Sequence, residues 1–530
     1  MSNPLSVPRP SRRALLAGAA GAAVALSTPR IAEASGPSQV ENLVIGTGYG
    51  GAVAAYRLAT AGRPVHMLEM GKRWNRRGLD GRIFSRMLGA DHRSTWFGNR
   101  TALPLSTMLG LNINLPILRS PGVLDRVNLG AMNVYVGRGV GGGSLVNGGM
   151  APRPRRDVIA RELPGLDIDA FFTTYLPRAE SRLGVNSISP AFRDSTPWYQ
   201  FTRTGSADAR AAGLRIADVP GVYDFAYMEQ EATGQARRSA LDGQVIYGND
   251  HGKRDVTKTY LAWAEATGRV SIDTMTEALT ITRRGAGYEV QARVRDVTGR
   301  FVANRTYRCQ RLFLAAGSTG SSELLLRSRA AGGLTDLSGD LGKFWGPNGN
   351  VMVGRANPLH RPTGGFQSTI PVAGIDNWDS KNPAFIEIAP LPVGGIDLFI
   401  QLYLAVTGSP VRSQFEMSDG RLTLAWTRAD SAPAIAMAKA TLDQINRRMF
   451  TLYRYDLFGT GRAFSDDFTY HPLGGAVLGK VTDNYGRVHG NPGLYVTDGA
   501  LIPGLVGVNP FLTITALAER LMDQVVARDL

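Results

Sequence analysis

The chain has 530 residues, a formal net charge of +15, 43% hydrophobic residues and a single cysteine, Cys309. This composition excludes a disordered or collagen-like protein, and one cysteine excludes an internal disulfide or a cysteine-cluster metal site. A chain this long exceeds what one hydrophobic core usually serves, so we expect two domains or one domain with large insertions. No nucleic-acid-binding motif accompanies the basic charge. It therefore indicates either contact with an anionic membrane surface or a generally solvated basic surface.

Residues 1–34 predict an export signal. Arg12 and Arg13 precede an apolar stretch that ends at Leu26, and Ala32-Glu33-Ala34 supplies a cleavage site with small residues at its ends. The stretch is too short to span a bilayer, and the paired arginines favour the twin-arginine route, which exports folded proteins. We therefore expect a secreted protein. The alternative is a disordered basic arm.

Residues 42–69 predict a strand, a glycine turn, a helix and a second strand. In the turn, Gly46 permits a sharp bend, Gly48 lets the backbone approach a pyrophosphate, and Gly51 lets helix and strand pack closely. Glu69 ends the second strand about 20 residues after Gly48, where an acidic residue accepts the ribose hydroxyls of a dinucleotide. The pattern therefore predicts a dinucleotide cofactor.

Two further segments stand out before the middle of the chain. Residues 103–118 are apolar without clean periodicity, which is typical either of a lid over an apolar ligand or of ordinary core. Residues 138–150 are glycine-rich, and such a loop lets backbone amides reach a flat ring or phosphates. We assign residues 138–150 to the cofactor and expect a ligand to order them. The alternative is a flexible surface loop.

Short strands follow the glycine-rich loop after a long insertion. We expect a meander beside the parallel sheet, and its strands are residues 270–272, 279–282, 288–294 and 301–309. A further parallel strand at 311–318 leads into an apolar helix that begins near Ser321.

The last part of the chain predicts a second sheet and a return to the first. The expected antiparallel strands are residues 384–388, 397–406 and 421–426, and a helix follows at 432–450. The chain then returns through a strand at 494–498 and a final helix from Pro510.

Three polar residues in this last part are candidates for chemistry. Glu387 lies in an apolar strand on the same face as Phe385 and Ala389, and it is either one half of a structural ion pair or a proton-transfer group. His471 precedes a proline, which forces an extended backbone and aims the imidazole away from the turn. Asn509 reads as the N-cap of the last helix, whose N-terminus favours an anion such as a reduced flavin. Structural roles for His471 and Asn509 are the alternatives.

Taken together, these motifs make the chain resemble the glucose-methanol-choline (GMC) oxidoreductases, and within them the bacterial cholesterol oxidases that hold FAD non-covalently. The resemblance spans nearly all of the chain after the leader. The segments that carry it are residues 44–50, 134–150, 316–325, 453–459, 471–480 and 495–515.

The resemblance implies an α/β fold with a Rossmann-like FAD-binding domain, of the type shared with p-hydroxybenzoate hydroxylase. A substrate domain built on an antiparallel sheet packed with helices accompanies it. The implied FAD-binding domain is discontinuous and comprises residues 39–75, 254–340 and 486–530. The implied substrate domain comprises residues 76–253 and 341–485, with 138–150 contacting the flavin.

The resemblance also implies which residues contact FAD. Glu69 contacts the ribose, Ala278 the adenine, and Asn147, Gly148 and Met150 the isoalloxazine. The other implied contacts are Gly46, Gly48, Tyr49, Gly50, Gly51, Gly143, Asp498, Gly499 and Phe511. Ser144, instead of a histidine, follows the glycine run, so the resemblance suggests non-covalent binding.

The same resemblance implies a 3β-hydroxysterol oxidase that uses O2 and releases H2O2. His471 and Asn509 would orient the substrate hydroxyl, and Glu387 would move the ring double bond from Δ5 to Δ4. We expect a monomer with transient membrane contact, no metal and no nucleic-acid partner. The alternatives are a family dehydrogenase for another bulky alcohol with a non-oxygen acceptor, and a flavin-loaded sterol-binding protein without turnover.

Overall fold

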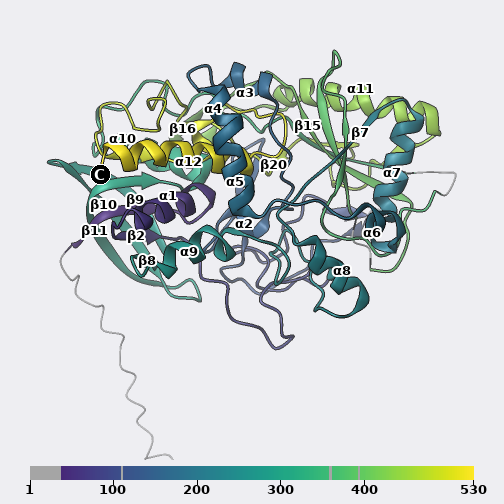
Figure 1. Cartoon of the computed structure of the whole chain (residues 1–530), viewed down its shortest axis with the longest axis horizontal. Helices are drawn as coiled ribbons and strands as arrows, with labels where there is room; N and C mark the ends of the chain where they lie inside the picture. The colour runs from purple at the N-terminus through teal and green to yellow at the C-terminus, as the bar shows by residue number, and fades with distance from the viewer. Residues whose placement is uncertain (1–36, 109–110, 357–360, 392–393) are drawn as a thin grey trace, which may run out of the picture. The chain divides into compact units, whose positions relative to one another are not determined.

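The first sheet is built around a buried parallel strand. In the computed structural model, which describes residues 37–108, 111–356, 361–391 and 394–530 (Figure 1), β1 (Ser38–Ile45) lies between two parallel neighbours. The strand order is β8-β2-β1-β11-β10-β9, and β21 also pairs with β11. The other strands are β2 (Val65–Leu68), β8 (Val270–Asp273), β9 (Thr276–Arg284), β10 (Gly287–Arg295), β11 (Phe301–Leu314) and β21 (Leu494–Val496). The predicted export signal lies outside the described residues.

Strand β11 differs from its prediction. The two strands expected at 301–309 and 311–318 form one strand of 14 residues, because no turn residue separates Cys309 from Arg311. Its first part pairs antiparallel with β10, and its last part is parallel to both β1 and β21. Strand β8 was expected in the antiparallel meander but runs parallel to β2. The meander is therefore continuous with the parallel sheet.

Helices pack on the parallel sheet as the glycine turn requires. Helix α1 (Tyr49–Thr60) follows the turn and contacts α9 (Tyr260–Ala266) and α12 (Phe511–Arg528). Helix α10 (Gly317–Ala330) begins four residues before its predicted start at Ser321. In α12, Pro510 occupies the N-cap position and no side chain caps the helix, so the predicted N-cap role of Asn509 is wrong by one residue.

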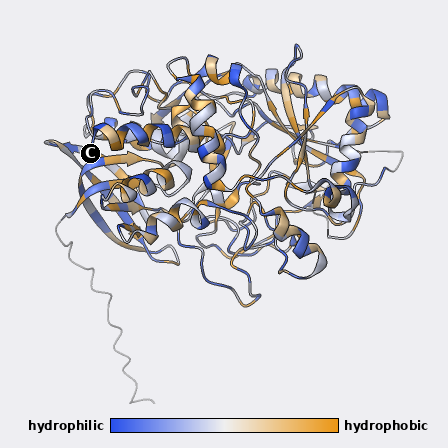
Figure 2. Ribbon diagram, viewed as in Figure 1, coloured by the Kyte–Doolittle hydropathy of each residue, from blue (hydrophilic) through white to orange (hydrophobic). Residues whose placement is uncertain are grey.

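The second sheet is antiparallel, and helices α7 and α11 pack against it (Figure 1). Its order is β18-β12-β15-β14-β13-β7, and β19 also pairs with β12. Its members are β7 (Arg215–Asp218), β12 (Asn350–Ala356), β13 (Ala373–Asp376), β14 (Ala384–Ala389), β15 (Ile400–Thr407), β18 (Leu452–Tyr453) and β19 (Phe464–Ser465). Helix α11 (Ala432–Met449) buries a largely apolar stripe at helical spacing, whereas α7 (Gln200–Ala211) buries small and polar residues beside Phe201. Figure 2 shows hydrophobic residues along the strands of this sheet.

One strand predicted for this sheet lies elsewhere. Strand β17 (Arg421–Leu424) pairs only with β16 (Phe415–Ser418), in a hairpin closed by Asp419 and Gly420 with positive φ values of 50° and 72°. Because most of its side chains are exposed or half-buried, β17 has no apolar face to place on the larger sheet.

A small third sheet connects the glycine-rich loop with the turn that carries His471. Its order is β20-β6-β5, with β5 (Leu124–Asn128) antiparallel and β20 (Phe468–Thr469) parallel to β6 (Asn133–Gly137). Since β6 and β20 run parallel, the glycine-rich loop and the turn with His471 leave the sheet at the same end. The remaining elements include β3 (Thr107–Met108), β4 (Leu111–Asn112), α2 (Gly143–Val146), α3 (Arg156–Glu162), α4 (Ile168–Ala170), α5 (Leu176–Leu183), α6 (Pro190–Ser195) and α8 (Phe225–Thr233).

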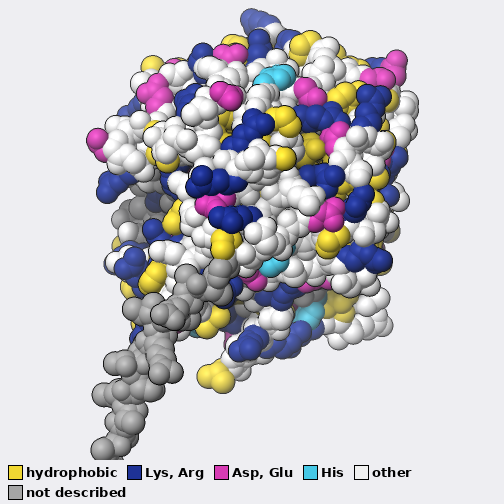
Figure 3. Space-filling view, turned by 90° about the vertical axis from the view of Figure 1, so that its left-hand side faces the viewer, with side chains coloured by type: hydrophobic (Ala, Val, Ile, Leu, Met, Phe, Trp, Pro, Cys, Tyr) yellow, Lys and Arg dark blue, Asp and Glu magenta, His cyan; other side chains and the backbone are white. Residues whose placement is uncertain are grey.

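The described residues, which begin at residue 37, form one compact unit, and the boundaries between the two domains stay a prediction. The surface charge is mixed. On the face drawn in Figure 3, Lys and Arg side chains are spread among acidic ones instead of gathering in one patch. In the part of the chain that the structure describes, none of the helices has the length and apolar character needed to cross a bilayer.

Candidate active site

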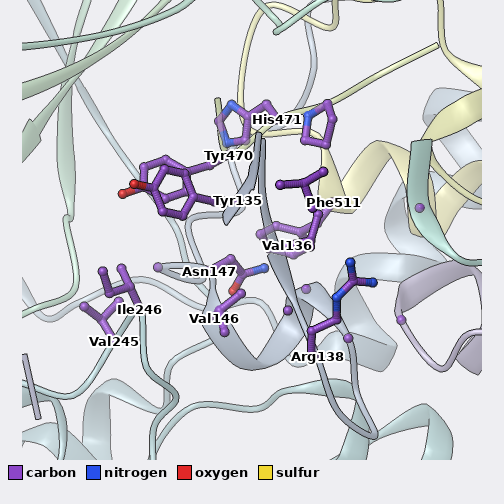
Figure 4. A pocket seen from close by; sticks show the side chains of 18 of the residues that line it. Tyr135, Val136, Arg138, Val146, Asn147, Val245, Ile246, Tyr470, His471 and Phe511 are labelled. Atoms are coloured by element: carbon purple, nitrogen blue, oxygen red, sulfur yellow. The ribbon is translucent and has the colours of Figure 1, made fainter. Parts of the chain in front are cut away.

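A single cavity of about 1020 Å³ brings the predicted site residues together (Figure 4). All of them except Gly51 line it, from both large sheets and the glycine-rich loop. They are Gly46, Gly48, Tyr49, Gly50, Glu69, Gly143, Asn147, Gly148, Met150, Ala278, Glu387, His471, Asp498, Gly499, Asn509 and Phe511. Gly51 lies behind the wall, where a Cβ atom would stand 2.2 Å from the carbonyl oxygen of Gly46. Its role is therefore the close packing that the motif predicts.

Bare backbone forms one end of the cavity. Gly46 has a φ of +97°, and a Cβ there would lie 2.3 Å from the carbonyl oxygen of Ala315. At Gly48 and Gly143, in contrast, an added Cβ would meet nothing within 4 Å. Helix α1 begins at Tyr49 without a side-chain cap, so its first N–H groups are available to an anion. This end of the cavity fits a pyrophosphate.

Glu69 connects the glycine turn to the glycine-rich loop. Its Oε1 accepts hydrogen bonds from the amides of Gly71 (2.8 Å) and Gly139 (3.2 Å), and its Oε2 accepts one from the Thr47 hydroxyl (2.5 Å). The Thr47 oxygen in turn accepts a hydrogen bond from the Gly141 amide at 3.0 Å. Burial raises the pKa of Glu69, and these hydrogen bonds oppose the increase. Sequence reasoning found Glu69 but missed Thr47, the variable position of the motif.

Hydrogen bonds within the protein hold the glycine-rich loop. The Ser144 hydroxyl donates to the Gly141 carbonyl at 2.7 Å, and the Asn147 amide donates to the Tyr49 hydroxyl at 2.8 Å. The Tyr49 ring stacks on Phe511, with ring centroids 4.9 Å apart. Contacts within the loop and with α1 thus hold it, and the expected ordering by a ligand stays a prediction.

Asp498 lies at the same end of the cavity as the glycine turn, next to the start of α10. Its carboxylate accepts hydrogen bonds from the amides of Gly317 (2.8 Å) and Ala500 (2.9 Å) and from the Ser321 hydroxyl (2.5 Å). Burial raises its pKa to about 6, and these hydrogen bonds oppose the increase. The residue therefore fixes the start of α10 where that helix meets the cavity.

Lys253 is a buried cation beneath the loop that the sequence analysis missed. Its ammonium donates to the carbonyl oxygens of Leu145 (2.9 Å) and Asn147 (2.5 Å), and burial lowers its pKa to about 7. When it is protonated, the Lys253 ammonium polarises the peptide between Asn147 and Gly148, and Gly148 lines the cavity. No motif marks this lysine, so no sequence signal could have found it.

His471 lies on the turn after β20, and two asparagines contact its ring. The Nδ1 atom is 3.0 Å from the Asn350 amide nitrogen and 3.3 Å from that of Asn348. Burial lowers the pKa of His471 to about 3, so the ring is neutral at physiological pH. The sequence analysis missed both asparagines. The only available signal was their position around a glycine at the start of β12.

Glu387 is fully buried on β14 and lines the same cavity, and among the described residues neither carboxyl oxygen has a hydrogen-bond partner. No ion pair joins it to a described basic residue, so the structural-pair alternative has no support there. Burial raises its pKa to about 8, and the nearby Asn509 side chain lowers it slightly without a well-aligned hydrogen bond. The Asn509 Oδ1 is also without a partner. Such groups are set up for a ligand.

The remaining wall is apolar. Leu103, Leu105 and Met108 line the cavity from the segment expected to be a lid or core, and Figure 4 shows Val245 and Ile246 below the paired rings of Tyr135 and Tyr470. In the same segment Leu111 is 71% exposed. The segment thus has an inner face, which lines the cavity and packs against a buried apolar cluster, and an outer face toward solvent. This arrangement is lid-like, but a role as a lid stays a prediction.

Comparison with known proteins identifies the family. Residues 40–336 match the GMC oxidoreductase model, and residues 348–459 and 406–518 match the C-terminal GMC oxidoreductase models. The chain therefore belongs to the GMC oxidoreductases, FAD-binding enzymes that act on CH–OH groups, which confirms the predicted family and fold class.

Similar proteins span most of the chain. A cholesterol oxidase of Mycobacterium tuberculosis is 27% identical over 90% of this chain and 89% of its own length. A cholesterol oxidase of Acinetobacter baumannii is 24% identical over 92% of this chain and 94% of its own. The crystal structure of pyridoxine 4-oxidase from Mesorbium loti superposes with a TM-score of 0.59 at 16% identity, covering 92% of this chain and 99% of that one. This last likeness is one of fold.

Proposed function

We propose that the protein is an exported FAD-dependent 3β-hydroxysterol oxidase that also isomerises the Δ5 double bond to Δ4. One observation carries the proposal: Glu387, a buried acid without a partner among the described residues, lines the same apolar cavity as His471 and Asn509. An alcohol oxidase alone needs no such acid, whereas a Δ5 isomerase does. The two relatives named cholesterol oxidase support the choice of substrate class.

In the oxidation, His471 and Asn509 hold the substrate. The neutral imidazole and the side-chain amide bind the hydroxyl oxygen and orient the carbon that carries it. FAD, when bound, would accept the hydride from that carbon and pass the two electrons to O2, and the hydroxyl proton, released to solvent, would balance one of the two protons that O2 takes up to form H2O2. The apolar wall excludes water from the reacting carbon.

In the isomerisation, the Glu387 carboxylate takes a proton from C4 of the ketone and returns it to C6. A pKa near 8 suits this exchange, because the group gains and loses a proton at little cost near neutral pH. Glu387 therefore acts as a shuttle in the second step only.

Non-covalent FAD binding is supported by the glycine-rich loop. Ser144 follows the glycines, and its hydroxyl already donates to the Gly141 carbonyl and accepts from the Val256 amide. Among the described residues, the cavity wall has one histidine, His471, whose ring is held by Asn348 and Asn350.

Contact with a membrane surface is part of the proposal. Leu111 and Leu118 are 71% and 79% exposed, and they belong to the segment whose inner face lines the cavity. A sterol could pass from a bilayer into the cavity across this outer face. Export through the twin-arginine route, a monomeric state and the absence of nucleic-acid or metal partners complete the proposal, and the first rests on the leader sequence alone.

A sterol panel tests the proposal. Anaerobic mixing with cholesterol should bleach the flavin, and admission of air should restore the colour with one H2O2 per ketone, followed by the conjugated enone. Bleaching that air does not reverse, but a quinone does, would favour a dehydrogenase. Tight sterol binding without any product would favour a sterol-binding protein.

A further inference from the structure

We infer that the lid-like segment, residues 103–118, docks on a bilayer that carries anionic phospholipid, with Arg100 and Arg119 against the headgroup phosphates and Leu111 and Leu118 in the apolar layer. Contact with a membrane is part of the proposed function, and the choice of a bilayer rests on it. The choice of an anionic lipid rests on the exposure and the charge of the segment itself.

Two antiparallel arms carry the segment. The amide of Phe97 donates to the carbonyl of Ser120 at 2.7 Å, and Arg100 forms an antiparallel bridge with Pro116. The chain therefore enters and leaves the segment at one place. Since Arg119 precedes Ser120, both arginines stand at this common base.

The outer face of the segment is apolar. Leu111 and Leu118 are mostly exposed, and residues 101–118 carry no charged side chain. Leu115 is partly exposed and also lines the cavity, as Met108 does from the other arm. An apolar outer face that continues into the wall of an apolar cavity fits the hydrocarbon layer of a membrane, from which a sterol would enter.

The two arginines at the base have no acidic partner among the described residues. Arg100 donates to the carbonyl of Asn114 at 3.0 Å, and Arg119 donates to the carbonyl of Phe97 at 3.1 Å. Both arginine side chains are exposed. A guanidinium bound only to neutral carbonyls keeps its full positive charge, and its remaining N–H groups are free to bind a phosphate.

Acidic side chains close to the segment do not cancel this charge. Along the chain these are Asp91 and Asp125, and each is bound to an arginine outside the segment, at 2.5 Å and 2.8 Å. Asp456, whose carbonyl oxygen accepts a hydrogen bond from the Thr107 hydroxyl, is also paired, with Arg454 at 2.7 Å. The base is therefore positive and complements an anionic lipid surface. A second copy of the chain would bring the same positive charge to a symmetric interface, so it is the less suited occupant.

Co-sedimentation of the FAD-loaded protein with vesicles tests the lipid. The vesicles contain no sterol and consist of phosphatidylcholine alone or of an equal mixture with phosphatidylglycerol. Because one arginine near an anionic surface changes partitioning about fivefold, the pair should account for about 25-fold of the preference for the mixed vesicles. Raising the ionic strength from about 0.05 M to about 0.5 M should remove most of this preference. Equal binding to the two kinds of vesicle would overturn the inference.

Two matched double variants separate the segment from the overall charge of the protein. Arg100→Gln/Arg119→Gln should lower the preference about 25-fold. Arg269→Gln/Arg283→Gln removes the same charge from two exposed arginines outside the segment, which also donate to backbone carbonyls, and should lower it less than about threefold. Equal losses in the two proteins would assign the attraction to net charge and count against the segment.

Leu118→Asn separates the apolar contact from the charge. It should weaken binding to both kinds of vesicle by about fivefold and leave the preference between them intact, because a leucine contributes equally to both. Unchanged binding to both would contradict the docking, and a concentration-dependent dimer without vesicle binding would make a second copy the occupant. None of these measurements needs a sterol. If cholesterol is not oxidised, the proposed substrate fails while the vesicle result still decides the lipid.

Discussion

The two ends of the cavity differ in how their polar groups are satisfied. At the glycine end, the carboxylates of Glu69 and Asp498 each accept several hydrogen bonds from neighbouring amides and hydroxyls. At the other end, Glu387 and the Asn509 oxygen have no partner among the described residues. At the glycine end the protein's own groups therefore satisfy both carboxylates, and a ligand there needs chiefly to fit the shape of the cavity. At the other end, the Glu387 carboxyl oxygens and the Asn509 oxygen remain available to form hydrogen bonds with a substrate, as a catalytic site requires.

The largest effect should come from filling the glycine end. Gly48→Val places a side chain in open space, and the residue's φ of −69° tolerates it, so the fold should persist while essentially all flavin is lost. Gly50→Val is the matched control, because its Cβ would lie 2.0 Å from the Thr497 carbonyl oxygen and should disrupt folding itself. Flavin absorbance and circular dichroism of both variants check this. Normal flavin content in Gly48→Val would contradict the assignment of that end.

Removing the unpaired acid should abolish one reaction and spare the other. For Glu387→Gln we expect the isomerisation to slow about 10²- to 10⁴-fold, the usual contribution of a general acid–base group, with release of the unconjugated Δ5-ketone. Oxidation should change little, because Glu387 acts after it. Product analysis by chromatography decides the point, and full formation of the conjugated enone would remove Glu387 from the mechanism.

Removing the side chains that contact the substrate oxygen should slow the oxidation by a somewhat smaller factor. His471→Ala and Asn509→Leu should retain FAD, since neither residue belongs to the glycine end, yet slow flavin reduction by about 10²- to 10³-fold. Stopped-flow measurement under anaerobic conditions gives the rate directly. Unchanged reduction with full flavin content would exclude these residues from the site.

The pH profile separates the two steps without mutation. Because burial raises the pKa of Glu387 to about 8, its carboxylate form becomes scarce below that pH. Isomerisation should then fall about tenfold per pH unit between pH 8 and 6. Oxidation should stay nearly flat there, since His471 remains neutral well above its pKa of about 3. Parallel profiles for ketone and enone formation would contradict this division.

The smallest effect should come from the outer face of the lid-like segment. Leu111→Asp should lower turnover of sterol in vesicles by roughly fivefold, corresponding to about 1 kcal/mol of lost contact, and leave turnover of detergent-dispersed sterol unaltered. Val297→Asp, at a residue 68% exposed in the turn between β10 and β11, outside the segment, is the control. Equal loss with both sterol preparations would argue against a membrane-facing role.

The sequence predicted the glycine end well because its signals are local. The turn, α1, β2 and Glu69 follow one another within 30 residues, and Gly51 packs against Gly46 inside that unit. Glu387, His471 and Asn509 were found from unusual local surroundings and from the family resemblance, and their roles stay predictions.

The partners of these residues could not be predicted in the same way. Asn350 and His471 are 121 residues apart, and Lys253 and Leu145 are 108 apart, so only the folded chain reveals the contacts. The strand errors have a related cause. Whether β8 runs parallel to β2, or β17 joins the larger sheet, depends on tertiary pairing and not on local pattern.

The parallel pairing of β6 with β20 limits which parts of the enzyme can move relative to one another. Asn133 bonds twice to the Asp467 carbonyl, through its backbone amide at 2.8 Å and its side chain at 3.0 Å, so the starts of the two strands are held together. Separating the two strands would break these bonds. Under the proposed function, we therefore expect substrate entry and product exit to depend on movement of the lid-like segment, residues 103–118, while the reacting groups keep their positions.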